Sequence, residues 1–222
     1  MRIIHTGDLH IGKVVNNFSM LQDQVKILHE MVVLAKTKDV QAFIIAGDVY
    51  DRSIPTAEAV TVMNHFLDEL KELNIAVFII SGNHDSPERI SFAENILEKQ
   101  SVFIAGNVKD KVKQVTINDE YGEVIITLLP FIKPALLSCK TCEEAVQRLL
   151  KTCKQDLEDS CKRNILVTHY FVTNAGNSPE LSDSETTVAV GGLDNVDACN
   201  FIGFDYVALG HIHKPQRMES GE

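Results

Sequence analysis

Five strand-like apolar runs of this chain each end in a short loop that contains residues of the types that bind metal ions. In four of the five loops a glycine stands immediately before the first such residue, which permits a tight turn and a close approach of the backbone to an ion. Loops that leave the carboxyl ends of strands in an open α/β sheet converge on the ligand site. The pattern therefore predicts one shared metal site, with these candidate ligands: Asp8, His10, Asp48, Asn83, His169, His211 and His213.

The ligand types indicate which ions such a site would hold. Two carboxylates, one amide oxygen and four imidazoles exceed the needs of one ion and suit two, with one carboxylate shared. Mixed nitrogen and oxygen ligation favours manganese, iron or zinc over magnesium and calcium. Paired ions about 3.5–4 Å apart activate a water and stabilise both the attacking and the leaving oxygen at phosphorus. The expected chemistry is metal-dependent hydrolysis of a phosphate ester.

Three neighbouring residues are expected to act on the substrate and not on the metal. His84 would protonate or stabilise the leaving oxygen as a general acid. The carboxylate of Asp51 would orient that imidazole by accepting its other N–H, although Asp51 also suits an ordinary turn. Arg52 would meet a phosphate oxygen, and the alternative is a solvated loop residue.

Composition sets the class of protein in which this chemistry would occur. A chain of 222 residues suits one domain, and its longest apolar run, 75–80, is far too short to span a membrane. No signal peptide precedes the first strand pattern, and the five cysteines avoid the ligand motifs, so we expect a reducing, cytoplasmic location. Cys139 and Cys142 have zinc-like spacing, but without a second pair nearby, core packing is the better interpretation for the cysteines of 142–161.

The charge distribution limits how a polyanion could be held. The net charge is −10, and residues 164–213 contain six acidic residues and no Lys or Arg. Proteins that hold nucleic acid alone usually present a basic surface. A polyanionic substrate must therefore be attracted by bound metal ions, by the N-terminal half or by a partner.

The remaining pattern alternates strands and helices. Helices are predicted over about 20–38 with Ser19 as N-cap, 56–73, 87–98 and 141–162, and strands near 102–104, 112–117 and 123–128. The polar segment 174–192 would be a solvated loop, a substrate gate or a dimer contact. A strand is expected to begin at 216–218, and the chain looks cut within that hairpin.

Four sequence motifs resemble those of the calcineurin-like metallophosphoesterase superfamily, and within it those of the SbcD-type DNA repair nucleases. The resemblance spans nearly the whole chain. The motifs are His5-Thr6-Gly7-Asp8-Leu9-His10, Gly47-Asp48-Val49-Tyr50-Asp51-Arg52, Gly82-Asn83-His84-Asp85 and Gly210-His211-Ile212-His213.

The resemblance implies an α/β fold, a four-layer αββα sandwich of two mixed sheets between helices, formed by one domain over 1–222. One ion would take Asp8, His10, Asp48 and His213, and the other Asp48, Asn83, His169 and His211. It also implies a manganese-dependent exonuclease on duplex ends and endonuclease on single strands or hairpins. Such enzymes work as homodimers with the SbcC ATPase, with no membrane involved. The wide apolar faces of the first two helices could cover the sheets alone or leave a stripe for a partner subunit, which is what the resemblance implies.

Two departures from the wider nuclease family leave alternatives open. Archaeal and eukaryotic relatives carry a histidine where this chain, like SbcD and the phosphoprotein phosphatases, has Asp51, and the capping and ATPase-binding segments expected downstream are absent from this sequence. A phosphatase or small-nucleotide phosphodiesterase with the same metal pair is the first alternative. A catalytically idle scaffold is the second, although such scaffolds are expected to have lost ligands.

Overall fold

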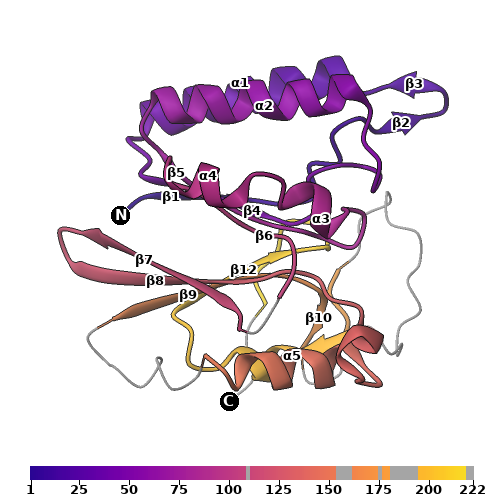
Figure 1. The fold of residues 1–222 in the computed structure, drawn as a ribbon, viewed down its shortest axis with the longest axis vertical. Helices are drawn as coiled ribbons and strands as arrows, with labels where there is room; N and C mark the ends of the chain where they lie inside the picture. The colour runs from indigo at the N-terminus through magenta and orange to yellow at the C-terminus, as the bar shows by residue number, and fades with distance from the viewer. Residues whose placement is uncertain (109–110, 154–161, 175–176, 181–194, 219–222) are drawn as a thin grey trace.

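Two four-stranded sheets form the centre of the molecule in a computed structural model that describes residues 1–108, 111–153, 162–174, 177–180 and 195–218 (Figure 1). The first sheet has the order β1 (Ile3–Thr6), β4 (Ala42–Ala46), β5 (Ala76–Ile80) and β6 (Val102–Ala105), and all four strands are parallel. The second has the order β12 (Tyr206–Gly210), β9 (Arg163–His169), β8 (Gly122–Leu129) and β7 (Lys113–Asp119), with only β7 antiparallel.

Helices cover the outer face of each sheet (Figure 1). Helices α1 (Leu21–Thr37) and α2 (Ala57–Glu72) pack on the first sheet, and α5 (Cys142–Leu150) packs on the second. Between the sheets lies a third apolar cluster, to which Ile44, Phe78 and Ile126 belong. The four-layer αββα sandwich is confirmed, with the first sheet wholly parallel in the described residues and the second mixed.

Continuous apolar runs form the central strands because both faces of each sheet are covered. All five residues of β4 are buried, as are four of the five in β5. Strands buried on both faces are apolar throughout, whereas half-exposed strands alternate. The runs that lead into the predicted ligands are therefore the interior of the sandwich.

Of the predicted helices, α2 is confirmed, with the Thr56 side chain accepting from the Ala59 N–H at 3.3 Å. The prediction of Ser19 as the first N-cap is wrong, because Ser19 ends strand β3 (Phe18–Ser19), which pairs with β2 (Val14–Val15), and Met20 takes the cap position. The helix predicted over 87–98 is divided into α3 (Pro87–Ile90) and α4 (Glu94–Glu98) by Ala93, whose φ is 59°.

The remaining elements lie toward the C-terminal end. They are η1 (Pro134–Leu137), β10 (Phe171–Thr173), β11 (Asn195–Asp197) and η3 (Ala198–Phe201), and β10 and β11 pair in parallel. The predicted strand at 216–218 is wrong, since those residues have no regular structure. Helix α5 ends at Leu150, and most of its predicted extension, like most of the 174–192 loop, lies outside the described residues.

Cysteines 142 and 153 are buried in the apolar cluster beneath α5, which confirms core packing for these two, whereas Cys161 lies outside the described residues. Among the helices that the structure describes, none combines the length and apolar character needed to cross a bilayer.

Candidate metal centre

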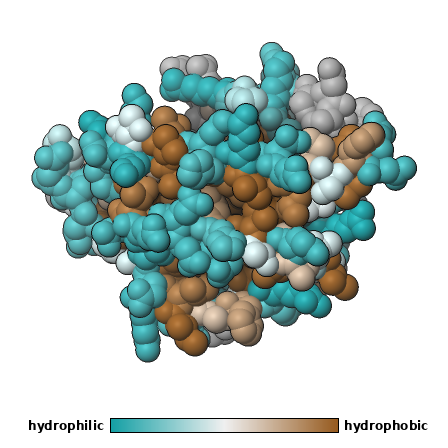
Figure 2. Space-filling model, turned by 90° about the horizontal axis from the view of Figure 1, so that it is seen from above, coloured by the Kyte–Doolittle hydropathy of each residue, from teal (hydrophilic) through white to brown (hydrophobic). Residues whose placement is uncertain are grey.

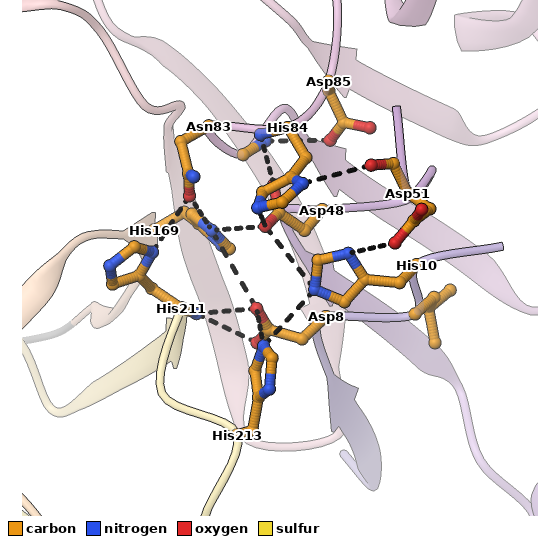
Figure 3. A network of polar contacts seen from close by, with 12 residues as sticks. Asp8, His10, Asp48, Asp51, Asn83, His84, Asp85, His169, His211 and His213 are labelled. Carbon is orange, nitrogen blue, oxygen red and sulfur yellow. Dashed lines mark hydrogen bonds and ion pairs between the residues drawn. The ribbon is translucent and has the colours of Figure 1, made fainter. Parts of the chain in front are cut away.

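The seven predicted ligands meet at the carboxyl ends of five parallel strands (Figure 3). Strands β1, β4 and β5 of the first sheet and β9 and β12 of the second supply them. Three groups of acidic and histidine side chains each have donor atoms within 4.8 Å of one another, and Asp8, His10 and Asp48 each belong to two of the groups. The structure therefore brings these side chains together at one place, and that they bind metal ions stays a prediction.

Backbone hydrogen bonds fix the loops that carry the first ligands. The Asp8 N–H donates to the carbonyl of Gly47 at 3.0 Å, and the His10 N–H donates to the carbonyl of Asp48 at 3.0 Å. These bonds continue the β1–β4 pairing beyond the sheet, so both loops turn together.

Four ligands stand in the left-handed region of backbone conformation, which non-glycine residues seldom adopt. Their φ angles are 55° at Asp8, 44° at His10, 49° at Asp48 and 85° at His211. Such conformations cost of order 1–3 kcal/mol each and cluster at functional sites. The surrounding hydrogen bonds hold the ligands in these conformations.

Glycine is required where the loops approach the ligands most closely. Gly47 has φ of 85°, and a Cβ there would collide with the ring of His169. A Cβ at Gly82 would collide with the carboxylate of Asp48. The glycines that precede the ligands in sequence therefore also make room for ligands from other strands.

One donor set gathers around His10, whose Nε2 lies 3.3 Å from Nε2 of His213 and 3.7 Å from Oδ2 of Asp48. The Nε2 of His213 in turn lies 3.6 Å from Oδ1 of Asp8. The backbone N–H of His211 donates to both carboxylate oxygens of Asp8, at 3.1 and 2.9 Å, which fixes that carboxylate.

A second donor set gathers around Asn83. Its Oδ1 lies 3.1 Å from Nε2 of His169 and 2.9 Å from Nδ1 of His211. The Nδ1 of the fully buried His169 bonds the carbonyl of Ala46 at 2.7 Å, so Nε2 faces the site, 3.4 Å from Oδ2 of Asp48. Oxygen Oδ2 of Asp48 thus lies between the two sets.

The spacing of these donors suits metal ions. Ligands bound at about 2.0–2.2 Å and roughly at right angles lie about 3 Å apart. The separations within each set run from 2.9 to 3.7 Å, close to that value. The residues present therefore fit a pair of divalent ions that share Asp48.

Burial and charge set the protonation of the site in the metal-free protein. Burial lowers the pKa of His10 to about 4, so its imidazole is neutral and able to bind a metal at pH 7. For Asp48, burial acts to raise the pKa, but the neighbouring His169 and the backbone N–H of His84 outweigh it and bring the pKa to about 2. Burial, together with the charge of Asp48, raises the pKa of Asp8.

His169 makes metal binding dependent on pH. Its burial acts to lower the pKa, but Asp48 and Asp8 outweigh burial and raise it above the usual value of 6.5. The raised pKa means that this imidazole holds its proton to a higher pH than a free histidine, and a cation must displace that proton to bind. We expect manganese binding to release protons and to weaken as the pH falls, by up to about tenfold per pH unit below that pKa.

Calorimetry in buffers of different ionisation enthalpy will measure this proton release. An affinity that stays constant from about pH 7 down to about pH 5.5, across the ordinary range of histidine titration, would contradict the assignment.

His84 stands at the rim of the centre, and its orientation corrects one prediction. Its Nδ1 bonds the backbone carbonyl of Asp51 at 3.1 Å, and Nε2 lies 4.0 Å from Oδ2 of Asp48. The predicted contact of the Asp51 carboxylate with His84 is wrong, because that carboxylate faces His10, with 3.7 Å between Oδ1 and Nδ1. Asp51 thus orients His84 through its backbone, and its side chain is placed to orient a ligand.

Arg52 lies next to the site in sequence, and most of its side chain is exposed to solvent. Its side chain is 75% exposed, and its Nε lies 3.7 Å from Oδ2 of Asp51. A contact with substrate phosphate stays a prediction for this residue.

Two positioning residues were not predicted from the sequence. The buried carboxylate of Asp85 accepts backbone N–H groups of Gly82, Val49 and Tyr50 at 2.9–3.1 Å, which joins the loops that carry Asp48 and Asn83. The Gln24 side chain accepts from Gly12 and donates to the carbonyls of Leu9 and His10. The available signals were an acid directly after His84 and a polar residue on the apolar face of α1.

Replacing Asp85 by asparagine should loosen the centre, because an amide NH₂ group would face backbone donors. We expect metal affinity or activity to fall about 10- to 100-fold, as for other residues that orient metal ligands. Manganese titration of Asp85→Asn measures this, with Asp39→Asn, whose side chain is 84% exposed, as the control. Equal manganese affinity in all three proteins would contradict the positioning role.

Comparison with known proteins agrees with the geometry. Residues 1–215 match the calcineurin-like phosphoesterase family. The chain is also 33% identical over 228 residues to the SbcD component of the SbcCD nuclease of Staphylococcus saprophyticus subsp. saprophyticus, an alignment that covers 99% of this chain and 58% of that protein. The chain thus spans little more than half the length of that relative. From the family match across nearly all of its residues, we conclude that this protein is a member of the calcineurin-like phosphoesterase family.

Proposed function

We propose that this chain is the nuclease domain of an SbcD-type protein, a phosphodiesterase that hydrolyses DNA with two divalent ions, manganese being the best suited. The observation that carries the proposal is the double donor set that shares Asp48, with His84 at its rim. The nuclease named among the relatives supports DNA as the substrate. Iron and zinc suit the same mixed nitrogen and oxygen ligands.

The two donor sets divide the ligands between the ions. Asp8, His10, Asp48 and His213 would hold one ion, and Asp48, Asn83, His169 and His211 the other. Bound as a pair, such ions acidify water and neutralise charge that develops on phosphate oxygens. With two carboxylates among the ligands, the loaded centre has a charge of about +2, which reverses the local field of an acidic protein.

The side chains of the protein supply orientation and a proton. The Asp51 carbonyl accepts from Nδ1 of His84, which fixes the ring and leaves Nε2 to face the substrate. When the ring is doubly protonated, as imidazolium, the proton at Nε2 can pass to the leaving oxygen of the DNA strand and leave the neutral ring with its Nδ1–H. His84 is half exposed, as a group that meets an incoming substrate must be.

The faces of α1 and α2 that point away from the sheet suit a second copy of the chain. Figure 2 shows apolar side chains among hydrophilic ones on this side of the molecule. In these two helices Val25, Ile27, Val33, Leu34 and Val60 are 45–51% exposed. Exposed apolar groups are typical of a protein interface where they form a continuous patch. A homodimer through these helices is part of our proposal, as is assembly with an SbcC-like ATPase.

Two glutamates placed in this surface should separate the dimer. We expect the wild-type protein to have the mass of two chains in solution, and the double variant Val25→Glu/Val33→Glu to have the mass of one. The introduced like charges would cost several kcal/mol, roughly a 100-fold weaker association. Light scattering after gel filtration measures the mass, and Tyr121→Glu, at a 73% exposed position on the β7–β8 turn, is the control. A monomeric wild-type chain, or a dimeric double variant, would refute this interface.

Cleavage of end-labelled duplex and hairpin DNA, beside a chromogenic phosphodiester, tests the function. We expect the wild-type chain with manganese to cleave all three. Cleavage of the small ester without cleavage of DNA would refute the nuclease proposal and support the alternative, a phosphatase or small-nucleotide phosphodiesterase of the same family. Cleavage of none of the three substrates would support a scaffold protein without catalytic activity.

A further inference from the structure

A pocket of about 560 Å³ opens beside the first donor set, between the loop after β1 and the segment after β12. The candidate ligands Asp8, His10 and His213 line it, as do Lys13, Ile212 and Pro215. Pockets of about 300–1,000 Å³ hold small ligands or parts of larger ones. The volume leaves room for a group next to the reacting phosphate.

Lys13 supplies the available positive charge of this pocket. Lys214 also lines it, but its ammonium pairs with the carboxylate of Glu180. Burial lowers the pKa of His5, whose two ring nitrogens bond the Tyr206 hydroxyl and the Leu209 carbonyl. For Lys13, no ion pair occurs with any residue that the structure describes.

The backbone of Lys13 is fixed on both sides. Its N–H donates to the carbonyl of His10 at 3.0 Å, and its carbonyl accepts from the N–H of Met20 at 2.9 Å. The Gly12 N–H donates to the Gln24 side chain at 2.9 Å. A half-buried lysine without an anionic partner among the described residues, held beside a proposed phosphate-ester site in a protein of charge −10, is placed to receive an anion.

We propose that this pocket binds the nucleotide next to the scissile phosphate, and that Lys13 contacts the phosphate of that nucleotide. The inference rests on the proposed function and adds a substrate subsite to it. Phosphate contacts by lysine fix the position of a strand without reading its sequence. The apolar side chains of Ile212 and Pro215 would lie against the sugar.

DNA binding as a function of salt tests the subsite directly. Anisotropy of a labelled duplex is measured in the His84→Ala background, which suppresses cleavage, with and without Lys13→Gln. One lost phosphate contact lowers the slope of log K against log salt by about 0.7–0.9, and affinity near 0.1 M salt falls roughly 5- to 10-fold. Lys13→Arg should restore the slope. Lys71→Gln, at a half-buried lysine in the last turn of α2, should leave it unchanged.

Manganese binding and hydrolysis of the chromogenic diester, which has no flanking phosphate, should be unchanged by Lys13→Gln with His84 intact. Equal salt slopes with and without Lys13 would overturn the subsite alone. A parallel loss on the small diester would also overturn it, because Lys13 would then act on the metal centre. No DNA binding by the parent protein would overturn the nuclease proposal, and the subsite with it.

Discussion

Asp48→Asn should lose the paired metal site and at least about 10³-fold in activity. The shared carboxylate is 3.7 Å from His10 and 3.4 Å from His169 through one oxygen, Oδ2, so both donor sets depend on its charge. Its pKa of about 2 keeps it ionised throughout the neutral range. A metal pair contributes several kcal/mol of charge stabilisation, and each 1.36 kcal/mol is tenfold in rate.

Asparagine is the informative replacement because it keeps the shape and one acceptor oxygen. The other oxygen, Oδ1, accepts the His84 N–H at 2.9 Å, and the amide carbonyl can retain that bond. Equilibrium dialysis will count the manganese ions, and thermal unfolding without metal will show whether the fold is intact. A folded variant that holds two ions with unchanged affinity would refute the shared ligand.

His84→Ala should retain both ions and lose about 10²- to 10⁴-fold in DNA cleavage, the usual contribution of a general acid. The loss should be much smaller on a p-nitrophenyl diester, because nitrophenolate departs readily without a proton. This contrast between leaving groups separates proton donation from a structural role. His65→Ala, at an exposed histidine of α2, is the control.

The assignment of His84 fails under either of two results. Loss of a manganese ion in His84→Ala would make the residue a metal ligand. Equal losses on DNA and on the p-nitrophenyl diester would mean that the residue positions the substrate without donating a proton.

The positions of the candidate ligands were predictable because residue type and strand position together determine where a side chain goes. Each apolar run must be buried, and the polar residue directly after it must then emerge at the sheet edge. Asp8, Asp48 and His169 follow this rule in both sheets. The layer order came from the family resemblance, since strand runs alone do not reveal which sheet a strand joins.

The failures share a physical cause, which is that backbone groups have no sequence signature. The group that orients His84 is the backbone carbonyl oxygen of Asp51, which accepts from the imidazole. The sequence pointed to the carboxylate of Asp51, which is the wrong acceptor of the same residue. The donors that Asp85 satisfies are amides of three residues. Ala93 divides a predicted helix by its φ of 59°, which helix propensity does not anticipate for alanine.

Counting manganese ions on the wild-type chain, with their electron paramagnetic resonance spectrum, tests the two-metal centre most directly. We expect two ions per chain at neutral pH. Because ions that share a carboxylate lie about 3.5–4 Å apart, we also expect a spin-coupled spectrum. One ion per chain, or two ions with the six-line spectrum of isolated manganese, would contradict the two-metal centre.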